Sequence, residues 1–199
     1  MSKTVEFFFD FGSPTSYLAW TQIPRLCAEL GAELIYKPML LGAVFQATGN
    51  ASPAMIPSKG RYMFRDMARF ARRYGVSLQF NPHFPINTLT LMRAAVGIKL
   101  REPERFAAFV MAIFHGMWVD ALNMGDPAVA GAVLAAAGFN AAAVLALATE
   151  PEVKEALKSN TDEAIGRGVF GAPSIFVGDE LFFGQDRLDF VREALLVDR

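Results

Sequence analysis

The stretch from Val5 to Ser16, VEFFFDFGSPTS, decides the fold. Within it, Val5 to Phe11 alternate β-favouring side chains between two faces, a pattern that predicts a strand ending at Gly12. From Ser16 to Leu30 the apolar residues fall at helical spacing, and Gly31 stands where helices commonly end. The sequence therefore predicts a strand that leads directly into a helix.

A second strand is expected to follow this helix. Residues Ala32 to Leu40 alternate again, and Pro24 is expected to kink the helix before them. Two strands joined through a helix lie parallel, with a right-handed crossover. The start of the chain thus predicts a fold of the α/β class.

The end of the chain predicts two further strands and a helix. Ser174 to Val177 and Glu180 to Phe183 flank the pair Gly178-Asp179, which is typical of a hairpin turn. A last helix is expected from Asp186 to Leu196. A strand-helix-strand unit followed by a strand-strand-helix unit is the arrangement of a thioredoxin fold.

The middle of the chain, from about residue 58 to 168, is expected to be helical throughout. Ala128 to Ala148 is almost wholly apolar but broken near Gly138, so we expect two buried helices here and not a membrane span. Thr149-Glu150-Pro151-Glu152 fits a capping box that opens a helix running to about Gly166.

These elements divide the expected fold into two parts. Residues 1–45 and 170–199 are expected to form the thioredoxin-like domain, and residues 46–169 an all-helical insertion domain. The sequence contains no repeats, no low-complexity linker and no charge block. We therefore expect the insertion to pack on the α/β part as one compact body.

Composition and charge narrow the class of protein. With 53% hydrophobic residues among 199, the chain is globular, and its net charge of -1 gives no general attraction to nucleic acid or anionic lipid. The single cysteine, Cys27, excludes an internal disulfide and a CxxC redox centre, and the two distant histidines leave no recognisable metal site. Glu6 and Asp10 interrupt any apolar signal segment, so a cytoplasmic protein without membrane partners is expected.

Ser13 stands where a thioredoxin fold carries its reactive group, at the start of the helix after the first strand. From the residues alone, Ser13 before Pro14 is also an ordinary helix N-cap followed by an N1 proline. Pro173 stands where such a fold places a cis proline, although it also fits an ordinary proline at the start of a strand.

Four segments carry a family resemblance: Phe9 to Ala19, Gly49-Asn50, Val169 to Pro173, and Phe183 to Leu188. In combination they resemble the 2-hydroxychromene-2-carboxylate isomerases and their relatives, the kappa-class glutathione transferases. In this family a serine replaces the first cysteine of the redox motif. The resemblance implies a thioredoxin fold with a helical insertion, glutathione as cofactor and a homodimer.

The resemblance also assigns roles to single residues. Ser13 becomes the hydroxyl that hydrogen-bonds the sulfur of glutathione. The backbone of Ala172 becomes the partner of the cysteinyl backbone, like an added antiparallel strand, which requires a cis Pro173. A directed hydroxyl is physically reasonable here, because a thiol with a pKa of about 8.5 is only a few per cent ionised at neutral pH.

The remaining glutathione contacts fall on two segments. Asp186 is expected to bind the γ-glutamyl ammonium, with Gln185 and Arg187 beside it. Asn50 and Lys59 are expected to face the ligand's backbone and glycyl carboxylate. Without the resemblance, Asp186 is equally well a charge at a helix N-terminus, and Asn50 a turn residue.

The expected activity is a glutathione-dependent isomerisation of 2-hydroxychromene-2-carboxylate or a related aromatic unsaturated 2-oxo acid, by reversible thiolate addition, bond rotation and elimination. The alternatives are a kappa-like transferase and a thioredoxin-fold binding protein that lacks the redox-motif cysteines and has no catalytic activity. The arginines between Lys59 and Arg73 fit the solvated face of an amphipathic helix. Trp118 fits the core, or the wall of an apolar substrate pocket.

Overall fold

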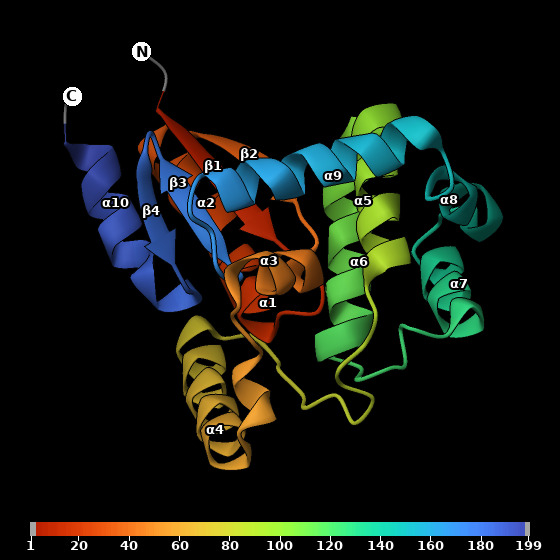
Figure 1. The fold of residues 1–199 in the computed structure, drawn as a ribbon, viewed down its shortest axis with the longest axis horizontal. Coiled ribbons are helices and arrows are strands. Elements are labelled where there is room, and N and C mark those ends of the chain that lie inside the picture. The colour runs from red at the N-terminus through yellow and green to blue at the C-terminus, as the bar shows by residue number, and fades with distance from the viewer. Residues whose placement is uncertain (1–2, 198–199) are drawn as a thin grey trace.

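The computed structural model describes residues 3–197 and has a mixed four-stranded sheet in the order β2-β1-β3-β4 (Figure 1). β1 (Thr4–Phe9) pairs in parallel with β2 (Glu33–Pro38), with Val5 opposite Leu34. β3 (Ser174–Val177) runs antiparallel to β1, and β4 (Glu180–Phe183) antiparallel to β3. The expected thioredoxin-like α/β fold is confirmed. Residues 1–2 and 198–199 of the expected domain lie outside the described residues.

Consecutive phenylalanines of β1 serve two different cores. Phe7 and Phe9 belong to the larger core, which the helices α2 (Ile23–Leu30) and α10 (Leu188–Leu196) help to form. Phe8 belongs to a smaller core on the opposite face, together with Phe176. Successive side chains of a strand point to opposite faces, so β1 is buried on both sides and forms the centre of the domain.

The expected single helix after β1 is instead two helices. α1 (Pro14–Trp20) ends at Thr21, and α2 begins at Ile23. Pro24 explains the break, because it has no N–H to donate and its ring would clash with the carbonyl of Trp20 in a continuous helix. It therefore lies in the first turn of α2, where the missing N–H costs nothing.

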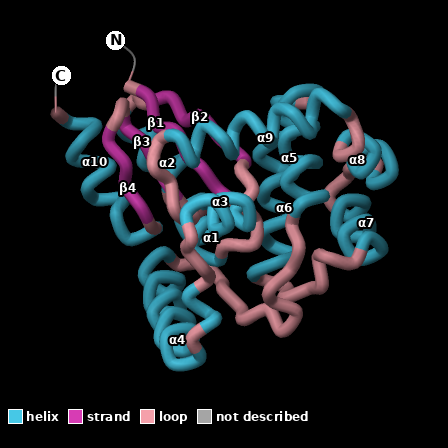
Figure 2. The backbone as a smooth tube through the Cα atoms, in the orientation of Figure 1, coloured by secondary structure: helices cyan, strands magenta, loops and turns pink. Residues whose placement is uncertain are grey.

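Seven helices connect β2 to β3: α3 (Leu41–Thr48), α4 (Pro57–Tyr74), α5 (Leu89–Arg101), α6 (Phe106–Trp118), α7 (Pro127–Ala136), α8 (Ala141–Leu147) and α9 (Pro151–Gly166). Short 3-10 turns occur at Pro53–Met55, Pro103–Arg105 and Gln185–Arg187. Figure 2 shows that a long loop joins α4 to α5. The expectation of helix throughout residues 58–168 is therefore wrong.

This loop, residues 75–88, is fixed by contacts that a local pattern does not contain. The N–H of Gln79 donates to the carbonyl of Trp118 at 2.7 Å. The side-chain amide of Asn81 donates to the carbonyls of Met117 and Leu122, at 2.8 and 2.9 Å. Prolines at 82 and 85 disfavour a helix across this segment.

The apolar stretch from Ala128 to Ala148 does form two helices, α7 and α8. Asp126 and Asn140 cap them by accepting from the backbone N–H groups of Ala128 and Ala143. The expectation that both are buried is wrong, since most of their alanines are partly or fully exposed. No single described helix is long and apolar enough to cross a membrane; only α7 and α8 together, bent by 119°, have the length and composition.

The expected helix to Gly166 is present as α9, but the capping box is not formed. The hydroxyl of Thr149 donates back to the carbonyl of Ala146 at 2.7 Å, and the N-cap residue Glu150 makes no side-chain cap bond. Glu152 instead pairs with Arg101 at 2.5 Å. The Glu152 side chain, which a capping box would require, is therefore bound to Arg101 of α5.

Aromatic packing joins the insertion to the sheet. Phe114 of α6 lies 5.0 Å, centroid to centroid, from Phe11 and 5.9 Å from both Phe9 and Trp20. One continuous core thus includes residues from both expected parts. The expected boundary at residue 45 falls inside α3, and the two-domain division stays a prediction.

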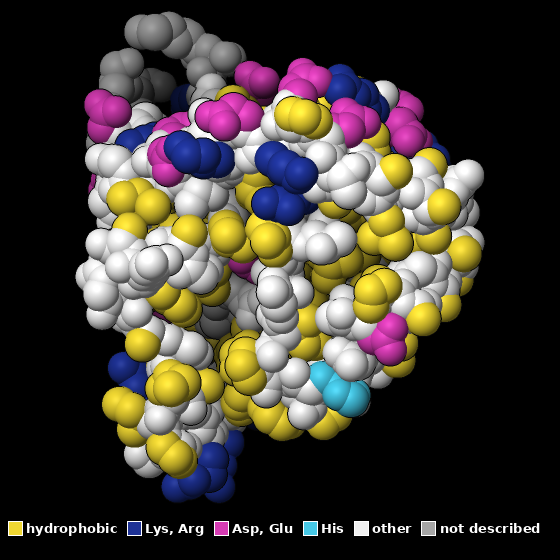
Figure 3. Space-filling model, turned by 45° about the vertical axis from the view of Figure 1, so that its right-hand side comes forward, with side chains coloured by type: hydrophobic (Ala, Val, Ile, Leu, Met, Phe, Trp, Pro, Cys, Tyr) yellow, Lys and Arg dark blue, Asp and Glu magenta, His cyan; other side chains and the backbone are white. Residues whose placement is uncertain are grey.

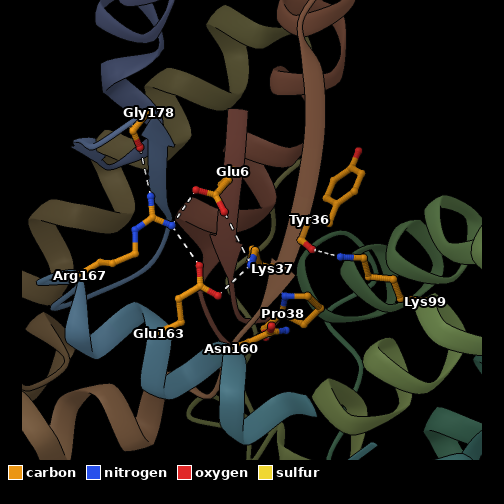
Figure 4. Close-up of polar contacts among 9 residues, drawn as sticks. All are labelled: Glu6, Tyr36, Lys37, Pro38, Lys99, Asn160, Glu163, Arg167 and Gly178. Atoms are coloured by element: carbon orange, nitrogen blue, oxygen red, sulfur yellow. Dashed lines mark hydrogen bonds and ion pairs between the residues drawn. The ribbon is translucent and has the colours of Figure 1, made fainter. Parts of the chain in front are cut away.

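Four charged side chains tie α9 to the sheet (Figure 4). Arg167, just after α9, pairs with Glu6 of β1 at 2.7 Å and with Glu163 at 3.1 Å. Lys37 of β2 pairs with Glu163 at 2.8 Å. The guanidinium of Arg167 also lies 3.7 Å from the ring centroid of Phe176. The start of the return path to β3 is therefore held on the sheet face.

Candidate functional site

A cavity of about 480 Å³ lies where the end of β1, the start of α1 and the loop before β3 meet α4. Five of the residues expected from the sequence line it: Ser13, Asn50, Ala172, Gln185 and Asp186. Its walls are mostly apolar, with aromatic side chains from Phe45, Tyr62, Phe64, Phe84 and Phe183. The structure thus brings together residues that lie far apart in the sequence.

Ser13 is both a helix cap and a cavity residue. Its side-chain oxygen accepts the N–H of Ser16 at 3.1 Å, which caps α1, and its hydroxyl donates to the carbonyl of Ala172 at 3.0 Å. Thr15 donates to the same carbonyl at 3.1 Å, and the two hydroxyl oxygens lie 2.9 Å apart. Ser13 therefore caps α1 and at the same time lies in the cavity wall, and its role toward a ligand stays a prediction.

The loop before β3 places the Ala172 carbonyl opposite these hydroxyls. The Ala172-Pro173 bond is cis, as the family resemblance required. The hydroxyl of Ser174 donates to the carbonyl of Gly171 at 2.9 Å and closes the loop. The carbonyl of Pro173 accepts the N–H of Gly184 at 3.0 Å, so this loop is joined to the segment that carries Asp186.

Asp186 stands in a 3-10 turn at one end of the cavity, and Arg187 pairs with its carboxylate at 2.5 Å. Gly184 makes room for this carboxylate: its φ is 103°, and a Cβ there would lie 2.6 Å from Oδ1 of Asp186. Tyr74 donates to the carbonyl of Gln185 at 2.8 Å. Burial, aided by the charge of Asp186, raises the pKa of Tyr74 to about 12, so its hydroxyl stays a donor at neutral pH.

Some of the other residues expected at the site line the cavity, and some do not. Asn50 lines the cavity, and its amide donates to the carbonyl of Phe170 at 2.8 Å. Lys59 is exposed on α4 and is not among the lining residues, nor are Pro173 and Arg187. Trp118 belongs to the core, where its indole N–H donates to the carbonyl of Phe11 at 2.8 Å.

Asp10 is a lining residue that the sequence reasoning missed. It is 1% exposed, and its carboxylate accepts from the N–H groups of Gly12 and Leu41, each at 2.8 Å, and from the hydroxyl of Thr88 at 2.7 Å. Burial raises the pKa of Asp10 although these hydrogen bonds oppose it. The sequence does contain a sign that Asp10 has polar partners: it is an acid within the apolar run FFFDF, where an unpartnered charge would be costly.

Thr15 and Asp66 were missed as well. The donation from Thr15 to Ala172 depends on a segment near the other end of the sequence, so no local signal announces it. Asp66 lines the cavity from α4, within the helix whose charges were assigned to a solvated face. It pairs with Arg69 at 3.1 Å.

The residues that the structure describes do not favour catalysis by a metal ion or by a cysteine nucleophile. Within residues 3–197, no group of three or more His, Cys, Asp or Glu side chains is arranged to hold a metal ion. The one cysteine, Cys27, is buried on α2, and burial raises the pKa of its thiol to about 11. A thiol with that pKa stays protonated at neutral pH and is a poor nucleophile.

The sequence pattern of the DSBA-like thioredoxin domain matches residues 4–196. The chain belongs to this DSBA-like thioredoxin family. Within the family it is 33% identical to a 2-hydroxychromene-2-carboxylate isomerase of Sphingobium xenophagum, over 98% of this chain and 100% of that protein. It is also 27% identical to the human glutathione S-transferase kappa 1, over 98% and 92% of the two chains.

Solved structures are also similar to this chain. A 2-hydroxychromene-2-carboxylate isomerase aligns with a TM-score of 0.83 at 30% identity, over 96% of this chain and 94% of that one. A probable DsbA oxidoreductase of Streptomyces coelicolor aligns with a TM-score of 0.76 at 18% identity, over 97% and 88%, a likeness of fold alone. The relatives support an isomerase or a function like that of glutathione transferases.

Proposed function

We propose that this protein is a glutathione-dependent isomerase that acts on 2-hydroxychromene-2-carboxylate or a related aromatic unsaturated 2-oxo acid. The observation that carries the proposal is the pair of hydroxyls, Ser13 and Thr15, aimed at the carbonyl of Ala172 inside an aromatic-walled cavity. Isomerase relatives about 30% identical over nearly the whole chain support the reaction class.

The cavity residues fit glutathione by the chemistry of their polar groups. Glutathione offers an ammonium group, amides, carboxylates and a thiol, and a volume of about 480 Å³ suits a ligand of that size. Asp186 would hold the ammonium, with Gln185 and Arg187 beside it, and the Ala172 backbone next to Pro173 would hold an amide. Asn50 would face the ligand's backbone, and Lys59 would have to turn from solvent to reach the glycyl carboxylate.

Ser13 would then change its hydrogen-bond partner. Its oxygen accepts a hydrogen bond from the N–H of Ser16. Its single hydroxyl hydrogen is donated to the carbonyl of Ala172. A sulfur anion beside Ser13 would attract this proton more strongly, because hydrogen bonds to charged acceptors are about twice as strong. The carbonyl would regain an acceptor position for a ligand amide, so no hydrogen bond is lost overall.

When bound, glutathione would supply a thiolate that adds reversibly to a conjugated carbon of the substrate, so that a fixed double bond becomes a single bond free to rotate. The protein's contribution is to favour the ionised sulfur through Ser13 and to seat the aromatic ring among apolar walls. Ser13 is not expected to act as a nucleophile itself, since the lining residues include no histidine to serve as its base.

A kappa-like glutathione transferase is the second candidate, because kappa-class relatives match over almost the whole chain. A mass balance separates the two. We would supply hydroxychromene carboxylate in excess over glutathione and follow product and free thiol. Turnover beyond one equivalent without loss of thiol supports the isomerase, whereas stoichiometric loss of thiol identifies the transferase. Absence of both turnover and thiol loss would favour the thioredoxin-fold binding protein that lacks the redox-motif cysteines.

We also propose a cytoplasmic homodimer, as the family resemblance implies. Sedimentation velocity tests the dimer, and fractionation of cells producing the protein tests the compartment. A monomer at the concentrations used in the activity assays would remove the homodimer from the proposal.

A further inference from the structure

A second cavity, of about 590 Å³, adjoins the first. The two share six lining residues: Ser52, Ala54, Gly60, Phe64, Phe84 and Pro85. In Figure 3 a hollow bordered by hydrophobic side chains separates the lower left projection, which carries α4, from the rest of the molecule. A ligand that lies along Phe64 and Phe84 can therefore contact both cavities.

The wall of the second cavity contains an aromatic pair in which Phe64 packs against the core and Phe80 lies outside it. Phe80 is 57% exposed, and its ring lies 4.6 Å from that of Phe64 at an interplanar angle of 88°. An exposed phenylalanine held edge-to-face against a second ring offers a flat apolar surface to a ligand. The wall is thus suited to an aromatic ring.

The two cavities differ in the sign of their charged residues. The charged lining residues of the first are Asp10, Asp66 and Asp186. Those of the second are Arg61 and Arg65, one helical turn apart on α4. Within residues 3–197 neither arginine takes part in an ion pair, unlike Arg69 farther along the same helix, which pairs with Asp66. A substrate carboxylate therefore meets no cationic side chain among the lining residues of the first cavity, and two guanidinium groups without an ion-pair partner in the second.

We infer that the second cavity is the subsite for the carboxylate of the substrate, with Arg61 and Arg65 as its cationic partners and Phe64, Phe80 and Phe84 as the ring wall. The assignment rests on the proposed function, because the reacting carbon must reach a sulfur beside Ser13 in the adjoining cavity. The substrate class is then an aromatic carboxylate long enough to extend past Phe64 and Phe84. A guanidinium group suits this task, since its planar donors match a carboxylate.

Naphthoate and naphthol are the probes for this subsite, because they share a ring system and differ in charge. Titration calorimetry at low ionic strength, without glutathione, would compare wild type with the double variant Arg61→Met/Arg65→Met. We expect naphthoate to bind about tenfold more weakly to the variant and naphthol to bind equally to both. Arg65→Lys should retain part of the affinity, because it keeps the charge but loses the planar donors.

Arg72→Met is the matched control: it removes the same charge from the exposed face of α4, at a residue that lines neither cavity. If Arg72→Met weakens naphthoate binding equally, the effect comes from the overall charge of the helix, and the subsite is overturned. Unchanged binding in the double variant would overturn it too, while glutathione binding and turnover could still support the isomerase. Failure of glutathione to bind, with arginine-dependent naphthoate binding intact, would reject the proposed function alone. A changed sedimentation coefficient with unchanged naphthoate affinity would identify this face as an interface between copies.

Discussion

The hydroxyl of Ser13 and the carbonyl oxygen of Ala172 lie 3.0 Å apart and join the first turn of α1 to the loop before β3. This contact connects two segments separated by the whole helical insertion. It also engages, within the protein, two groups that the proposed reaction needs for its ligand. The geometry therefore allows both groups to be tested separately.

Ser13→Ala should raise the pKa of the bound glutathione thiol. A hydrogen bond to a charged group is worth about 1.5–3 kcal/mol, which corresponds to roughly one to two pKa units. At neutral pH the isomerisation rate should fall by at most about 10- to 100-fold, because less of the sulfur is ionised. The ultraviolet absorbance of the thiolate, followed against pH, measures the shift directly.

A control for Ser13→Ala must separate loss of the helix cap from loss of the hydroxyl donor. Removing an N-cap costs about 1 kcal/mol of stability. Asn140→Ala removes a comparable cap, from α8, at a residue that does not line the cavity. It should lower the free energy of unfolding similarly and leave the rate unchanged. An unaltered rate in Ser13→Ala would remove Ser13 from the mechanism.

Asp10→Asn should destabilise the fold at neutral pH by about 1–3 kcal/mol, because the amide nitrogen would face an N–H donor, such as that of Leu41. Burial raises the pKa of Asp10 above its ordinary 3.8, so the folded protein keeps a proton that the unfolded chain has lost. The stability that wild type gains from this proton is complete below about pH 3.8 and is lost as pH rises through the raised pKa.

Urea denaturation at a series of pH values measures this effect of Asp10. The advantage of wild type over Asp10→Asn should shrink as pH rises from 3.8, and Asp120→Asn, at an exposed position, is the control for removing an aspartate. An advantage that grows with pH over this range would contradict the raised pKa.

Glu163→Gln should have the opposite pH dependence. Burial tends to raise the pKa of Glu163, but hydrogen bonds and charges from Lys37 and Arg167 outweigh it and lower the pKa below 4.5. The ionised form therefore stabilises the fold above pH 4.5, and this contribution is lost as pH falls through the lowered pKa. At neutral pH we expect a loss of roughly 1 kcal/mol, since the pairs are partly exposed.

The same denaturation series tests Glu163. The difference between wild type and Glu163→Gln should disappear in acid and diminish in high salt. Glu155→Gln, at an exposed position of α9 outside the ion pairs with Lys37 and Arg167, is the control for removing a glutamate from the same helix. A difference that persists at low pH would mean that Glu163 acts through packing and not through its charge.

Gly184→Ala should disturb the Asp186 turn. Position 184 has a φ of 103°, and a Cβ would approach Oδ1 of Asp186 to 2.6 Å. We expect a loss of about 1–3 kcal/mol of stability and weaker glutathione binding, measured by calorimetry. Gly166→Ala, in α9 and with open space around its Cβ position, should be neutral or stabilising by about 0.4–1 kcal/mol. Equal behaviour of the two variants would refute the steric argument.

The sequence predicts elements well where the deciding interactions are local. β3 and β4 flank Gly178 as expected, and Ser13 caps α1 through its neighbour Ser16. The prediction failed where distant contacts decide. Residues 75–88 form a loop held by contacts with α6 and the turn after it, and Thr149 turns toward Ala146 and leaves the capping box unformed.

The residues of the candidate site, too, were predicted where local sequence decides their position and missed where distant contacts decide it. Ser13 and Asp186 lie at element starts, which the sequence marks, and both reach the cavity. Lys59 and Gly60 are neighbours in the sequence, but they lie about 100° apart around α4, and only Gly60 lines the cavity. The amphipathic pattern of this helix favours a solvated position for its charged residues, and the ligand role of Lys59 came from the resemblance alone. Asp10 needs Leu41 and Thr88 to reveal its role.

The central place of β1 has a consequence for biosynthesis. During translation β2 emerges soon after β1 and can cover one of its edges, but β3 emerges only after the seven helices that follow β2. Until then the other edge of a strand containing Phe7, Phe8 and Phe9 has open backbone groups, a state prone to association with other chains. The nascent protein is thus expected to depend most on chaperones in the interval after β2 and before Ser174 leaves the ribosome.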